Sequence, residues 1–149
     1  MYEVSNNEVV DTCNFPKVVV NLVKADDIKE LMSKWVNLYE LNKPFTFIFN
    51  LNYLNCNMKS LSNGLVLSNF IKRIKKLRII NPEKYNNLRE SFIIVKDNSC
   101  NTFIRSIFNL TTPLSNTYIV NSFEKVDKIY NQINNNEEID YKEIKLIKP

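Results

Sequence analysis

Short apolar runs alternate with stretches of helical periodicity along most of this chain. The runs are rich in β-branched and aromatic residues, which favours strands, and we predict strands at 17–23, 45–50, 91–95 and 117–120. Apolar residues recur at helical spacing after each of them, which predicts helices at about 28–41, 65–77, 101–110 and 123–133. Strand and helix in alternation require right-handed crossovers and a mostly parallel sheet. The predicted fold class is therefore α/β.

The two ends of the chain depart from this alternation. Residues 3–10 are expected to pair with the strand at 17–23 as an N-terminal hairpin, which makes the sheet mixed. Near the other end, NNNEE at 134–138 breaks the helical periodicity, and the residues that follow are charged and mildly apolar. We therefore predict one domain over 1–134 and a charged C-terminal tail over 135–149.

The absence of one residue type and the scarcity of another limit the chemistry of the chain. It has no histidine, and Gly64 is its only glycine. The lack of histidine excludes Ser-His-Asp and Cys-His nucleophile activation and histidine-bearing metal sites. A single glycine excludes the glycine-rich loops that hold phosphate groups. Without paired carboxylates at helical or strand-end spacing, we expect no catalytic residues, no metal and no cofactor, and hence a protein that is not an enzyme.

The cysteines and the hydropathy profile bear on location. Cys13, Cys56 and Cys100 are odd in number and far apart, so we expect reduced thiols rather than a disulfide framework. Cys56 is the one candidate nucleophile, because it follows a strand where open α/β sheets place their ligands; the alternative is a structural cysteine. No apolar run approaches the roughly 20 residues of a transmembrane helix, and no signal peptide is visible. These features predict a cytoplasmic protein.

Composition also bears on the source. Asparagine, isoleucine and lysine are heavily used while glycine and histidine are scarce. This bias is typical of AT-rich genomes, such as those of large DNA viruses or some protists. A viral source would make the virion the alternative location.

The single glycine stands in SLSNGL at 60–65, between the second predicted strand and the second predicted helix. We expect a sharp turn there, in which glycine allows an unusual backbone angle or a close approach of helix and sheet. Ser62 is expected to cap the following helix or, alternatively, to accept phosphate.

The order of elements and this loop together resemble the STAS fold, named for sulfate transporters and anti-sigma factor antagonists. In that family a strand ends in asparagine or aspartate and an apolar residue, and a loop of the form Asp-Ser-Ser/Thr-Gly-Leu follows. The matching residues here are Phe49-Asn50-Leu51 and LSNGL at 61–65, and the resemblance covers roughly residues 1–133. It implies a non-enzymatic domain that binds a protein partner through this loop. The antagonists carry their phosphorylated residue just before the glycine, where this chain has Asn63, so the resemblance implies a binding surface without that switch.

A strongly basic segment follows the glycine. Residues 71–78 carry five positive charges, and at 100° per residue Lys72, Arg73 and Lys76 share the helix face opposite the apolar residues. One interpretation is a solvated helix surface. The other is contact with an acidic protein, an anionic membrane surface or nucleic acid.

These observations predict a protein-interaction module with an unidentified protein partner. The expected partner-binding residues are Ser60, Ser62, Asn63, Gly64, Leu65, Lys72, Arg73 and Lys76. The alternative is a structural or packaging protein of a virion, which uses the fold as a scaffold.

Overall fold

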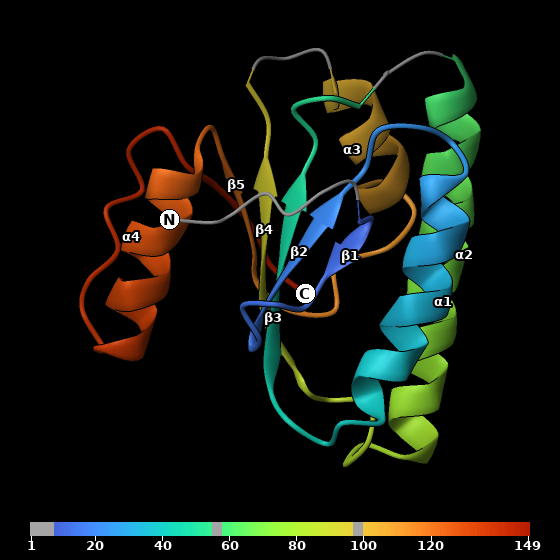
Figure 1. Cartoon of the computed structure of the whole chain (residues 1–149), viewed down its shortest axis with the longest axis horizontal. Coiled ribbons are helices and arrows are strands. Elements are labelled where there is room, and N and C mark those ends of the chain that lie inside the picture. Colours follow the sequence, from blue (N-terminus) through green and yellow to red (C-terminus); the bar gives the residue numbers. More distant parts are fainter. Residues whose placement is uncertain (1–7, 55–57, 97–99) are drawn as a thin grey trace.

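The structure, a computed structural model, describes residues 8–54, 58–96 and 100–149, without the side chains of 58–61. Six strands and four helices occur in these residues (Figure 1). The strands are β1 (Val10–Asp11), β2 (Lys17–Asn21), β3 (Phe45–Asn50), β4 (Leu88–Ile94), β5 (Thr117–Val120) and β6 (Lys145–Ile147). The helices are α1 (Asp27–Tyr39), α2 (Met58–Ile80), α3 (Asn101–Phe108) and α4 (Phe123–Asn134). The α/β fold class is confirmed.

One mixed sheet keeps all its strands in chain order, from β1 to β6. β2, β3, β4 and β5 are parallel neighbours, while β1 pairs antiparallel with β2 and β6 antiparallel with β5. The predicted N-terminal hairpin is confirmed in its described part, where Val10 lies opposite Val20. Each connection between parallel strands leads to the next strand of the sheet, always in the same direction. Because such connections are right-handed, α1, α2 and α3 lie on one face of the sheet. Figure 1 shows these three helices together and α4 on the opposite face.

Each face of the sheet has its own hydrophobic core, because neighbouring residues of a strand point to opposite faces. Phe47 packs with the residues of α1, α2 and α3, whereas Ile48 lies in a second cluster with Val126 of α4. Trp35 of α1 is central to the first cluster, with ring centroids 4.8 Å from Phe47 and 5.2 Å from Phe70. Both faces of β3 are therefore covered, which explains why its sequence is apolar almost throughout.

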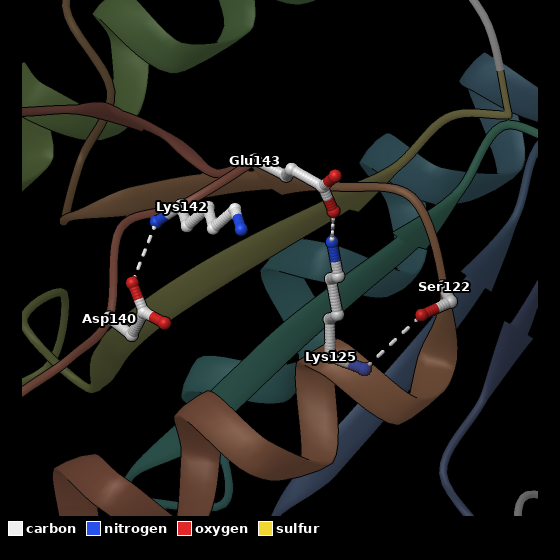
Figure 2. Close-up of polar contacts among 5 residues, drawn as sticks. All are labelled: Ser122, Lys125, Asp140, Lys142 and Glu143. Carbon is white, nitrogen blue, oxygen red and sulfur yellow. Dashed lines mark hydrogen bonds and ion pairs between the residues drawn. The ribbon is translucent and has the colours of Figure 1, made fainter.

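The segment predicted as a charged tail adds an edge strand to the sheet. Ser122 caps α4, since its Oγ accepts a hydrogen bond from the Lys125 backbone N at 3.3 Å. α4 ends near Asn136, whose φ of 54° is left-handed and turns the chain back toward the sheet. The Lys125 Nζ lies 2.6 Å from Oε2 of Glu143 and holds the returning segment against α4 (Figure 2). Residues within 135–149 thus reach β5 and form β6 beside it.

A buried tyrosine makes the fold sensitive to alkaline pH. The Tyr39 hydroxyl accepts a hydrogen bond from Nε1 of Trp35 at 3.0 Å, and the side chain is fully buried. Burial raises the pKa of Tyr39 from 10.0 to about 12, because the phenolate would lose its hydration. The neutral phenol is favoured in the folded state, so Tyr39 contributes its full stabilisation at pH values below the unfolded-state pKa. This stabilisation is lost as the pH rises from the unfolded-state pKa through the folded-state pKa.

We therefore expect the free energy of unfolding to fall between pH 10 and pH 12, with about 2 to 3 kcal/mol of the loss due to Tyr39. Denaturant titrations of the wild type and Tyr39→Phe over this range would measure it. The variant, which cannot ionise at this position, should show the shallower pH dependence even if its stability at neutral pH is lower. Identical pH profiles would contradict the assignment.

Candidate functional site

The residues predicted to bind a partner lie on a single helix rather than on a loop followed by a helix. The sequence predicted a turn at 60–64 and a helix from Leu65, whereas α2 begins at Met58. The predicted turn is therefore wrong. Ser62 lies inside α2, so it does not cap the helix, and its side chain is exposed. The side chain of Ser60 lies outside the described part of the structure, and so does the whole of Cys56.

Gly64 lies where α2 crosses α3, and its φ is not in the left-handed region. A Cβ at this position would overlap Oγ of Ser106 and would lie 3.0 Å from the Ser106 Cβ and 3.3 Å from the carbonyl oxygen of Phe103. The Ser106 hydroxyl is itself held in place, because it donates to that carbonyl at 2.6 Å. Glycine is thus required for the close approach of two helices, and not for a turn or for contact with the sheet.

An exposed stripe runs along the outer side of α2. We call it the α2 stripe, and it consists of Ser62, Leu65, Val66, Asn69, Lys72, Arg73, Lys76, Ile79 and Ile80, all exposed and all within one side of a helical wheel. Of the predicted residues, Asn63 is half-buried and Gly64 is buried, so neither belongs to it.

The α2 stripe has a basic centre between two apolar ends. Leu65 and Val66, at one end, are 46% and 44% exposed, and Ile79 and Ile80, at the other, are 83% and 79% exposed. A single exposed apolar side chain is ordinary on a protein surface, but four that flank three cations on one helix form a continuous surface of mixed character. Leu65 was among the predicted partner-binding residues, whereas Val66, Ile79 and Ile80 were not, although the same helical periodicity places them beside the basic residues.

The five positive charges of residues 71–78 have two different roles. Lys75 donates to the hydroxyl of Thr112 at 2.7 Å, and Arg78 donates to the carbonyls of Tyr85 and Leu114 at 3.2 and 3.1 Å. Burial lowers the pKa of Lys75, and neighbouring positive charges add to the effect. These two cations therefore hold α2 against the loops that follow α2 and α3.

The other three cations of this segment face solvent, as the sequence predicted. Lys72, Arg73 and Lys76 are exposed, and none of them forms an ion pair with any residue that the structure describes. Arg73 lies over the ring of Phe70, with 5.5 Å between its guanidinium carbon and the ring centroid. The centre of the α2 stripe thus carries three positive charges that are available to an anionic surface.

Cys100 departs from the prediction of reduced thiols. It is buried and disulfide-bonded, and its partner lies outside the described residues. Spacing along the chain gave no sign of this pairing, because a disulfide depends on proximity in the fold and not on sequence separation.

Two cavities open at the carboxyl edge of the parallel strands, the edge where open α/β sheets place their ligands (top of Figure 1). The larger, of about 690 Å³, lies at the ends of β2 and β3. Its polar groups bind one another: Nδ2 of Asn50 donates to Oδ1 of Asn21 at 3.1 Å, and the Asp27 carboxylate accepts from the backbone N atoms of Val23 and Lys24, each at 2.9 Å. The smaller, of about 490 Å³, lies at the ends of β4 and β5 and is lined by basic side chains.

Neither metal-binding nor membrane-spanning features occur in the part of the chain that the structure describes. No three histidine, cysteine or carboxylate side chains there come close enough together to hold a metal ion. No helix there has both the length and the apolar character to cross a bilayer.

Comparison with known proteins gave no match to a family model, a curated protein or a solved structure. Function is therefore inferred from the surface of the chain itself, and its most distinctive surface is the α2 stripe.

Proposed function

We propose that the protein is a non-enzymatic interaction module that binds an acidic partner protein through the α2 stripe. The observation that carries this proposal is the arrangement of three exposed cations, without ion pairs among the described residues, between two pairs of exposed apolar side chains. Apolar ends provide area that is buried on association, and the cations select a partner with carboxylates opposite them. A helix with complementary acidic and apolar residues would match this surface.

A protein fits the α2 stripe better than a membrane or nucleic acid does. An amphipathic helix enters a membrane interface with its apolar face, but that face of α2 is buried in the core through Phe70, Ile71 and Ile74. Nucleic acid would pair with the three cations but would leave the four apolar side chains without contacts. Both the charge and the apolar area are used only when the partner is a protein.

The sheet supports a STAS-like interaction domain. An N-terminal hairpin followed by parallel strands that alternate with helices is the arrangement on which the resemblance to the STAS family rests. In that family the partner binds around the residues that correspond to 61–65. Ser62 and Leu65 of this segment are exposed and begin the α2 stripe, so the proposed surface includes the place that the resemblance indicates.

Charge reversal at the centre of the stripe tests the proposal. We expect Lys72→Glu/Arg73→Glu/Lys76→Glu to reduce partner binding by about tenfold or more, because three attractive pairs become repulsive. A photo-crosslinking residue at Asn69 would capture the bound partner from extracts of the native host, and quantitative mass spectrometry would compare the variants. The three side chains are exposed, so stability should change by no more than roughly 0.5 kcal/mol for each.

The matched control is Lys29→Glu/Lys128→Glu/Lys148→Glu, which changes the net charge equally at exposed positions outside α2. It should leave the crosslinked partner within about twofold of the wild type, as expected of screened surface charges. Capture that survives the reversal at α2, or that both triple variants lose equally, would contradict the proposal.

A structural role in a virion is the second candidate, and the disulfide of Cys100 favours it over a cytoplasmic role. Disulfides persist in secreted proteins and at virion or cell surfaces and are rare in the reducing cytosol. The crosslinking experiment separates the two functions, because a packaging protein would capture coat or core proteins in stoichiometric amounts and an interaction module would capture a regulatory partner.

A further inference from the structure

We infer that the cavity at the carboxyl ends of β4 and β5 binds a small phosphate-bearing molecule with an apolar body. We call it the basic cavity. Its volume of about 490 Å³ is in the range of pockets that hold small ligands. Its cationic lining comes from three separate parts of the chain: Lys96 after β4, Arg105 on α3 and Lys145 on β6.

The positive charge of the basic cavity is not neutralised by the described protein. Among the described lining residues Glu143 is the one acid, and Nζ of Lys125, outside the lining, lies 2.6 Å from the Glu143 carboxylate (Figure 2). Lys125 lowers the pKa of Glu143, so this acid is ionised and already paired. Within the described ranges, Lys96, Arg105 and Lys145 form no ion pair. Three like charges around one cavity repel one another, and an anion between them removes that repulsion.

The remaining lining indicates what kind of anion fits. Asn101 and Asn121 each bring a side-chain amide that can donate to an oxygen, and the arginine can bind two oxygens at once. A phosphate monoester carries a charge of about −1.5 to −2, which three cations can balance. Aliphatic side chains, including Ile104 and Ile144, line the cavity as well, and a bare inorganic anion would leave them without contacts. An apolar group attached to the phosphate would cover them.

The basic cavity and the α2 stripe share no residue, so the two proposals can be tested separately. Phenyl phosphate is a suitable probe, since it joins an apolar ring to a phosphate. We would titrate it into the full chain and follow backbone amide shifts by NMR, with inorganic phosphate and phenol as the two fragments. We expect saturable shifts around Lys96, Arg105 and Lys145, and an affinity at least about tenfold higher than that of either fragment.

Two double variants test whether phenyl phosphate binds in the basic cavity. Arg105→Ala/Lys145→Ala, both at exposed positions, should weaken phenyl phosphate binding by about tenfold or more, because each removes a charge-assisted hydrogen bond. Lys72→Ala/Lys76→Ala removes the same charge from the α2 stripe and should leave the affinity within about twofold. Shifts that do not saturate, or an equal loss in both double variants, would overturn the inference and leave the α2 proposal untouched.

Discussion

Replacing Gly64 with valine is expected to lower the free energy of unfolding by about 1 to 3 kcal/mol, the usual effect of overpacking a close contact. The new Cβ would overlap Oγ of Ser106 and would come within 3.3 Å of the Phe103 carbonyl oxygen. Neither neighbour moves freely, because the two are hydrogen-bonded to each other on α3. Denaturant unfolding monitored by circular dichroism would measure the change.

A double-mutant cycle identifies Ser106 as the cause. Ser106→Gly alone should destabilise by roughly 0.5 to 1 kcal/mol, the effect of glycine inside a helix. The second single variant of the cycle is Gly64→Ala. In Gly64→Ala/Ser106→Gly the side-chain atoms of residue 106 that the new Cβ would overlap are gone, so the double variant should be more stable than these two single variants predict, by about 1 kcal/mol. Additive effects, or an unchanged stability of Gly64→Val, would contradict the close helix crossing.

Replacing Trp35 with alanine is expected to destabilise the protein by about 3 to 5 kcal/mol, as for other large aromatic side chains removed from a core. The indole ring lies between Phe47 of the sheet and Phe70 of α2, and its Nε1 donates to the Tyr39 hydroxyl. Its loss would open a cavity where α1, α2 and β3 meet. Because domains are stable by only about 5 to 15 kcal/mol, a large part of the variant could be unfolded near physiological temperature.

Two controls make this result specific to packing. Trp35→Phe keeps most of the apolar volume and loses the hydrogen bond, so it should destabilise by less than half as much as the alanine variant. Val36→Ala changes the neighbouring residue, which is on the exposed side of α1, and should shift stability by about 0.5 kcal/mol or less. Thermal unfolding of the three variants in parallel would give the order, and a Trp35→Ala protein as stable as Val36→Ala would contradict the central role of the ring.

The sequence predicted the central elements well, because their signals are local. β3 and β5 begin and end at the residues predicted, since each is an apolar run that turn residues interrupt on both sides. The start of α4 at Phe123 was predicted as well, and Ser122 beside it supplies the helix cap. In each case the determining residues are a few positions away along the chain.

The errors all involve contacts between distant segments. Serine, asparagine and glycine have low helix propensity and predicted a turn at 60–64, but packing of α2 on α3 overrides that local preference. β6 has only three residues, none of them fully buried, and only its pairing with β5 makes it a strand. The disulfide of Cys100 is likewise a property of the fold and not of the spacing.

The candidate site also has a part that local sequence signals predicted and a part that depends on contacts between distant segments. Helical periodicity is local, so it predicted that Lys72, Arg73 and Lys76 share an exposed face. Followed to both ends of α2, the same periodicity would also have predicted the exposure of Val66, Ile79 and Ile80. The basic cavity could not be predicted, because its three cations come from segments that are separate in sequence and meet only at the sheet edge.

The short outer strands restrict how copies of this protein can associate. β1 has two residues and β6 has three, and both run antiparallel to the longer strands that they cover. A β-sheet recruits a strand from another molecule through a long row of unpaired backbone groups, and neither described border offers such a row. The described edges of the sheet therefore do not favour pairing with a strand of another copy, even at high protein concentration. Copies of this protein would instead associate through side-chain surfaces.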